Sequence, residues 1–67
     1  MANAIIKHLS LEIRHAYMAG KFSARAFGKV FRLEHVYASQ WRVTDESGND
    51  IGLRFNVDRG NLHFFLA

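Results

Sequence analysis

Two turn sequences in the carboxyl half of the chain constrain its fold more than any other feature. They are "DESGND" at 45–50 and "DRGN" at 58–61, and they separate three segments in which apolar and polar residues alternate, "VYASQWRVT", "IGLRFNV" and "LHFFLA". Alternation with a period of two is typical of strands with one buried face, and Gly beside Asp or Asn is typical of hairpin turns. The sequence therefore predicts a three-stranded antiparallel β-meander over about residues 36–67.

The length of each loop predicts which residues face one another, because a shift of one residue turns every side chain to the other face. A two-residue loop at 59–60 pairs apolar residues throughout: Val57 with Leu62, Phe55 with Phe64, and Leu53 with Leu66. A three-residue loop at 46–48 pairs Val43 with Ile51 and Trp41 with Leu53. Both registers bury the same face of the middle strand. The other, outer face then carries Gln40, Arg42, Arg54, Asn56, His63 and Phe65.

The amino-terminal part, at about residues 3–33, is predicted to be helical. Asn3 is suited to cap a first helix, and Gly20 is suited to end it. Between them, apolar residues recur at a spacing of 3.6 residues: Ile5, Ile6, Leu9, Ile13, Ala16 and Tyr17.

A second helix is predicted from Ser23 to about Leu33. Its apolar stripe comprises Phe27, Val30 and Phe31, while Gly28 in its interior is unfavourable. An extended strand competes with this interpretation, because residues 31–43 also alternate between apolar and polar. The helix is favoured because it places the basic residues of this segment opposite the apolar stripe.

A chain of 67 residues forms one domain, here residues 1–67. The predicted fold class is α+β, with two N-terminal helices packed on a three-stranded antiparallel β-meander. Domains this small often gain stability from disulfides, a metal or a partner subunit, and the chain contains no cysteine. The apolar fraction of 49%, with six Phe, two Tyr and one Trp, favours either an unusually aromatic core or a surface that another chain buries.

No motif predicts catalysis, a metal site or a cofactor. His8 and His15 are about two helical turns apart, or ~10 Å, which is too far to chelate one ion. His35 and His63 belong to other segments. Phosphate-binding, dinucleotide-binding and zinc-protease motifs are all absent from the sequence. We therefore expect no catalytic residue, no metal ligand and no cofactor.

Positive charge is concentrated toward the amino terminus. Residues 1–44 hold seven of the nine Lys and Arg residues but two of the six Asp and Glu residues. On helices, six of these cations form a basic stripe: Lys7, Arg14, Lys21, Arg25, Lys29 and Arg32. Such a stripe is able to meet phosphates or an acidic protein, or it simply keeps a helix face solvated.

A second candidate surface is an apolar ridge away from the core-facing side of the first helix. It comprises Leu11, His15, Met18 and Phe22. A cluster of this kind predicts a partner-binding or dimer surface. The alternative is that the ridge packs on the second helix.

The outer sheet face is the third candidate surface. Its site residues are Arg42, Arg54, His63 and Phe65. Basic and aromatic groups on a sheet resemble single-stranded nucleic-acid platforms. The alternative is that Arg54 and Phe65 form a cross-strand cation–π pair.

The last segment is also predicted to be an unprotected sheet edge, since residues 62–67 contain no Lys, Glu, Asp or Pro. We expect a homodimer or a partner strand to cover it, and the alternative is that the helices of the same chain cover it. The predicted function is a non-catalytic protein-interaction module that homodimerises or docks on a larger complex, as phage- and plasmid-encoded inhibitors do. The alternative is a small basic nucleic-acid-binding protein. The expected location is the cytoplasm of its own cell or of an infected host, without membrane attachment.

Overall fold

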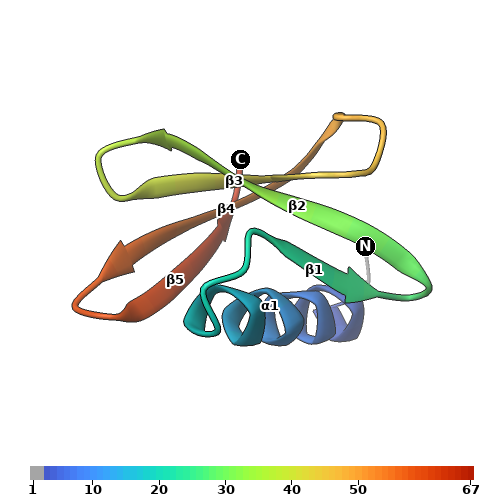
Figure 1. The fold of residues 1–67 in the computed structure, drawn as a ribbon, viewed down its shortest axis with the longest axis horizontal. Coiled ribbons are helices and arrows are strands. Elements are labelled where there is room, and N and C mark those ends of the chain that lie inside the picture. Colours follow the sequence, from blue (N-terminus) through green and yellow to red (C-terminus); the bar gives the residue numbers. More distant parts are fainter. Residues whose placement is uncertain (1–2) are drawn as a thin grey trace.

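One helix and five strands make up the fold in the computed structural model, which describes residues 3–67 (Figure 1). The helix comes first, and each strand then pairs with the next in an antiparallel sheet of order β1-β2-β3-β4-β5. The elements are α1 (Asn3–Met18), β1 (Ser23–Ala26), β2 (Lys29–Tyr37), β3 (Gln40–Thr44), β4 (Asp50–Asp58) and β5 (Asn61–Leu66). The sheet curls, and α1 lies against its concave face (Figure 1).

The predicted second helix is wrong, because its residues form the β1–β2 hairpin. Ala26 pairs with Lys29 across a two-residue turn in which Phe27 and Gly28 have φ values of 56° and 70°. Positive φ at both central positions is typical of the type I′ turn, which matches the twist of paired strands. Gly28 is therefore a turn residue, and the predicted fold of two helices on a three-stranded meander is replaced by one helix on a five-stranded sheet.

Side-chain alternation explains why this segment is extended. In β1, Ala24 and Ala26 are buried while Ser23 and Arg25 are exposed. A helix would instead have exposed the alanines on several faces and placed a glycine in its interior. The small buried alanines also let the helix approach closely, and β1 is the strand that α1 packs against most extensively.

The first predicted helix is confirmed. It ends in a Schellman motif, in which Lys21 N–H donates to Ala16 C=O at 2.9 Å and Gly20 N–H to Tyr17 C=O at 3.0 Å. Leu9, Ile13 and Ala16 are buried, as expected for its inner face. Ile5 differs from the prediction and is 44% exposed.

The predicted meander corresponds to β3–β5, the last three strands of the five-stranded sheet, and the predicted register of its second hairpin is correct. Val57 faces Leu62, Phe55 faces Phe64, and Leu53 faces Leu66. The predicted first strand over 36–44 is wrong at its start, because Tyr37 ends β2 and pairs with Gln40, the first residue of β3.

The first hairpin of the meander follows the predicted register only near its turn. Thr44 lies opposite Asp50, but Arg42 lies opposite Arg54, so β4 bulges between these two pairs. Gly52, with φ of 84°, lies in the bulge, where a residue with a side chain would be strained. Trp41 consequently faces Phe55 rather than Leu53. Because the shift is two residues, Trp41 keeps its predicted face.

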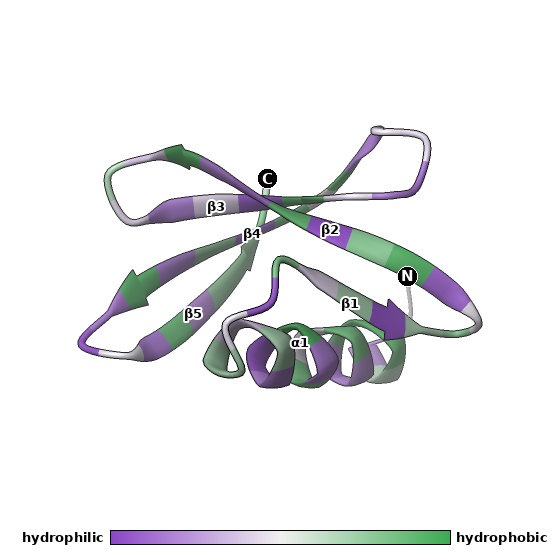
Figure 2. Ribbon diagram, in the orientation of Figure 1, coloured by the Kyte–Doolittle hydropathy of each residue, from purple (hydrophilic) through white to green (hydrophobic). Residues whose placement is uncertain are grey.

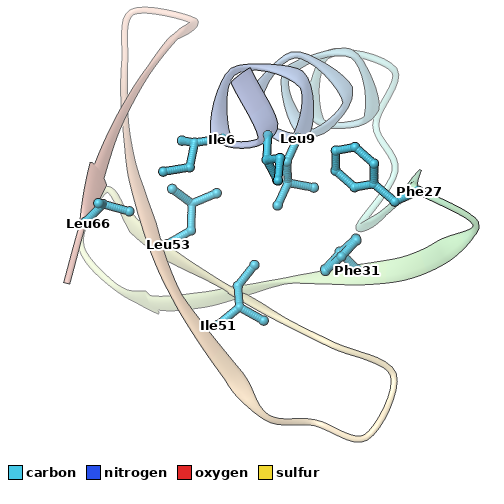
Figure 3. Close-up of a pocket in the computed structure, with 8 residues that line it drawn as sticks. Ile6, Leu9, Phe27, Phe31, Ile51, Leu53 and Leu66 are labelled. Carbon is cyan, nitrogen blue, oxygen red and sulfur yellow. The ribbon is translucent and has the colours of Figure 1, made fainter. Parts of the chain in front are cut away.

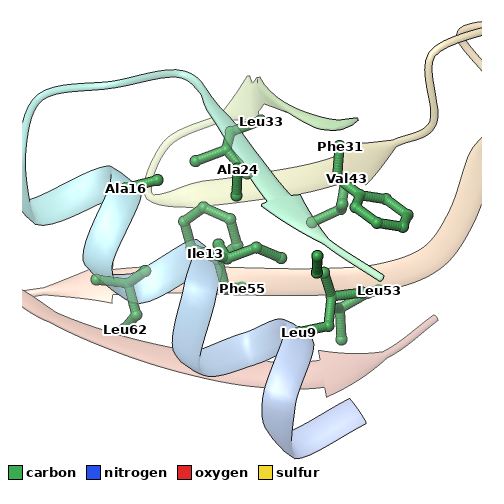
Figure 4. Close-up of a cluster of buried hydrophobic side chains, with 11 residues drawn as sticks. Leu9, Ile13, Ala16, Ala24, Phe31, Leu33, Val43, Leu53, Phe55 and Leu62 are labelled. Carbon is green, nitrogen blue, oxygen red and sulfur yellow. The ribbon is translucent and has the colours of Figure 1, made fainter. Parts of the chain in front are cut away.

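A single core lies between α1 and the concave face of the sheet (Figure 4). Ile13, Val43 and Phe55 are fully buried at its centre. Figure 2 shows hydrophobic and hydrophilic residues alternating along the strands. Among residues 3–67, no helix has both the length and the apolar character that crossing a membrane requires.

Candidate functional site

The second half of β5 has backbone groups that point away from the sheet. Ala67 N–H donates to Gly52 C=O at 2.8 Å, so residue 67 points toward β4. Successive backbone groups alternate sides along an edge strand. The N–H and C=O groups of Leu62, Phe64 and Leu66 therefore point outward, away from β4.

Arg14 covers the first half of this edge from α1. Its Nη2 donates to the outward Leu62 C=O at 3.2 Å, which agrees with the assigned direction. The Arg14 guanidinium also lies over the Phe64 ring, 5.6 Å from the ring centroid. Within residues 3–67, the outward backbone groups of Phe64 and Leu66 have no such hydrogen-bond partner.

The side chains beside these open groups are apolar and exposed. Phe65 is 40% exposed on the convex face and Leu66 is 63% exposed on the other face. We call the outward backbone groups of Phe64 and Leu66, together with the side chains of Phe65 and Leu66, the β5 edge site. The opposite edge strand, β1, is protected in ways that β5 is not, since it has four residues, carries Arg25 and lies beside α1.

An apolar cavity of about 190 Å³ opens next to the β5 edge site (Figure 3). Leu66 forms part of its rim, and Leu53 and Ile6 point into it from β4 and α1 (Figure 3). The lining residues are Ile5, Ile6, Leu9, Phe27, Phe31, Ile51, Leu53 and Leu66. Small-molecule sites usually exceed ~300 Å³ and contain a few placed polar groups. This cavity has no polar side chain in its lining, so it suits an apolar side chain better than a substrate.

The predicted outer-face residues lie side by side on the convex face. Arg54 sits between Arg42 and Phe65, and the neighbouring row holds Gln40, Asn56 and His63. Arg42 Nε forms an ion pair with Glu34 Oε1 at 2.9 Å.

Arg54 is also paired on this face, with Asp50 in the bulge. The distance from Arg54 Nη2 to Asp50 Oδ2 is 2.6 Å. Hydrogen bonds from the Arg54 guanidinium and from the Gly52 N–H lower the pKa of Asp50 from 3.8 to about 2. The same carboxylate raises the pKa of Arg54. Asp50 therefore largely neutralises the positive charge of Arg54 on the convex face.

The structure does not bring the predicted basic stripe together. Arg25 and Arg32 are diagonal neighbours on the convex face, since Arg25 faces Val30 and Ser23 faces Arg32. Lys29 faces Ala26 beside the turn, so its side chain belongs to the opposite face. The remaining members lie elsewhere: Lys7 and Arg14 on α1, and Lys21 in the loop after it.

The predicted apolar ridge is divided as well. Leu11, His15 and Met18 are exposed on α1, and Leu11 and Met18 are 46% and 56% exposed. They have no second helix to pack on, because that segment is a hairpin. Phe22 leaves the ridge and stacks on Trp41, with ring centroids 5.8 Å apart and planes within 8°.

Sequence reasoning missed the apolar cavity and the acidic partners of the convex arginines. The cavity combines residues from α1, the β1–β2 turn, β2, β4 and β5, so no local spacing signals it. The Arg54–Asp50 pair has a local signal, since it joins residues four apart, but it depends on the bulge that brings them together. Within the part of the chain that the structure describes, no three potential metal ligands cluster.

Comparisons with protein-family models, with curated proteins and with solved structures find no match to this chain.

Proposed function

We propose that this chain is a small protein-binding module that takes an extended segment of a partner along the β5 edge site. The observation that supports the proposal is the pair of open backbone positions at Phe64 and Leu66, flanked by exposed apolar side chains. A segment added to a sheet edge gains backbone hydrogen bonds, and its alternate side chains gain contacts on each face. The adjacent cavity offers an apolar surface for one of those side chains.

The alternative of nucleic-acid binding has weaker support. Arg42 and Arg54 are each neutralised by a carboxylate at hydrogen-bond distance. Phe65 is the exposed aromatic residue in their row, whereas stacking platforms usually offer two or three. Arg25 and Arg32 remain as convex-face cations for which the structure shows no ion pair within residues 3–67.

The experiment that tests the proposal compares the loss of the backbone N–H with the loss of the side chain at one residue, Leu66. Leu66→Pro removes an outward N–H, so it spares the bonds that β5 makes to β4. Leu66→Ala is the matched control, because it keeps the N–H and removes most of the side chain. Both variants are compared with the unmodified chain for binding to a set of extended peptides, measured by fluorescence polarisation, with far-UV circular dichroism as the check on folding.

Strand addition predicts that folded Leu66→Pro loses peptide binding while Leu66→Ala retains part of it. Binding that survives in a folded Leu66→Pro variant would contradict the proposal. The salt dependence provides a second readout, since phosphate recognition weakens steeply with salt while backbone pairing does not. Preferential, salt-sensitive binding of a single-stranded oligonucleotide would favour the alternative.

A further inference from the structure

The symmetry of the edge itself indicates what occupies the β5 edge site, and this inference rests on the proposed function. Two copies of one edge strand pair in antiparallel fashion about a two-fold axis, so the same surface must match itself. Residues 62–67 carry no Lys, Arg, Asp or Glu, so two such edges do not repel one another. The edge carries apolar residues on both faces, namely Phe64 and Leu66 on one and Phe65 on the other.

The directions of the backbone groups limit the possible registers, because outward groups must meet outward groups. Phe64 can therefore face the partner's Leu62, the partner's Phe64 or the partner's Leu66. The first two registers require the Leu62 C=O, which Arg14 already occupies. The third register pairs Phe64 with the partner's Leu66, so it leaves the Arg14 contact in place.

We propose that the partner is a second copy of this chain, paired through β5 with Phe65 on the two-fold axis. In this arrangement Phe64 and Leu66 exchange backbone hydrogen bonds with the partner's Leu66 and the partner's Phe64. Phe65 meets the partner's Phe65 on the convex face. The partner's Phe64 lies against Leu66 at the rim of the apolar cavity, which covers the most exposed apolar side chain of the edge.

The expected association is weak. A standard stable interface buries about 800 Å² on each partner, which is close to a fifth of the 4538 Å² that this chain exposes. A short strand pairing buries less than that. The dimer is therefore expected to populate at high protein concentration and to dissociate on dilution.

A pair of cysteine variants tests the register directly, because the chain contains no cysteine of its own. Residues on the axis form a non-hydrogen-bonded pair with Cα atoms about 4.5 Å apart, which is within the range for a disulfide. Phe65→Cys should therefore cross-link rapidly to a second copy under mild oxidation. His63→Cys is the matched control, since it is exposed on the same face but lies opposite the partner's Ala67.

Selective cross-linking of Phe65→Cys over His63→Cys supports the proposal. Equal rates for the two variants overturn it, as does a cross-link formed mainly when the two variants are mixed, which reports the register centred on Phe64. Amide hydrogen exchange in the unmodified monomer then distinguishes failure of the dimer proposal from failure of the proposed function. Fast exchange at Phe64 and Leu66 leaves the edge open for another partner, whereas protection in a monomer contradicts both proposals.

Discussion

Replacing aromatic residues of β4 and β5 by leucine tests which face of the sheet is the core. Phe55 is fully buried, Phe64 is half-buried and Phe65 is 40% exposed on the opposite face. Leucine retains much of the buried volume, so each variant is expected to remain folded and measurable. The predicted order of lost stability is Phe55→Leu, then Phe64→Leu, then Phe65→Leu.

The expected magnitude for Phe55→Leu follows from its ring contacts. Its ring stacks on Trp41 at 5.9 Å, meets Tyr17 edge-on at 6.0 Å and lies 5.3 Å from Phe64. Each aromatic pair contributes about 0.5–1.5 kcal/mol beyond the area that it buries. Leucine restores part of this contact, so we expect a net loss of about 1–3 kcal/mol. Phe55→Ala would cost about 3–5 kcal/mol, a large part of the total stability of most small domains.

The two neighbouring residues on β5 provide the comparison. Phe64→Leu loses its contact with Phe55 and the cation–π contact of Arg14, worth about 0.5–1 kcal/mol. Phe65→Leu changes a side chain on the convex face and should cost no more than about 0.5 kcal/mol in the monomer.

Urea unfolding is the measurement, followed by the fluorescence of Trp41, the single tryptophan, and by far-UV circular dichroism. The protein is kept dilute so that self-association adds nothing to the measured stability. If Phe65→Leu loses as much stability as Phe55→Leu in a monomer, the assignment of the buried face is wrong.

Three further predictions concern the polar groups. Thr44 is 1% exposed and its Oγ1 has no hydrogen-bond partner within residues 3–67. Thr44→Val should therefore raise the free energy of unfolding by about 1 kcal/mol. A lower melting temperature for this variant in thermal unfolding would mean that the hydroxyl is hydrogen-bonded. The pKa of Asp50 is about 2, below its ordinary 3.8, so the stability from its pair with Arg54 is present above pH 4 and is lost as the pH falls toward 2. Asp50→Asn should flatten the stability curve over that interval, and an unchanged curve would contradict the pairing. The double variant Arg25→Glu, Arg32→Glu should change stability by less than about 0.5 kcal/mol, and oligonucleotide titration shows whether these cations bind phosphate.

The carboxyl half shows how much of the fold the sequence determines by itself. Alternation between residues 36 and 67 and the two turn sequences were sufficient to predict the β3–β5 meander and the pairing of Phe55 with Phe64. The unprotected β5 edge could also be predicted, because protection depends on residue types that residues 62–67 lack. Local patterns were sufficient here because hairpin pairing joins neighbours along the chain.

The β1–β2 hairpin was not predicted, although the relation between loop length and facing residues also applies to it. A two-residue loop at Phe27–Gly28 pairs Ala24 with Phe31, and it continues to Leu33, whose N–H donates to Phe22 C=O at 2.9 Å. The competing helical spacing was equally consistent with the local sequence. The tertiary structure decided between them, since the curled five-stranded sheet packs its concave face on α1, while a second helix would have left the first strand of the meander unpaired on its outer side.

The same distinction between local sequence and tertiary packing applies to the interaction surfaces. The residue types showed which side chains are cationic and which are apolar, but the predicted surfaces depended on the assumption of a second helix. That segment is a hairpin, in which Lys29 lies on the opposite face from Arg25 and Arg32. The bulge at Gly52 directed Asp50 toward Arg54, and the curl of the sheet assembled the cavity from distant segments. The sequence determined the hairpin turns of the carboxyl half and which edge lacks protection, because those depend on neighbouring residues. The tertiary structure alone decided which charges are neutralised and where apolar side chains meet, because those depend on how separate elements pack.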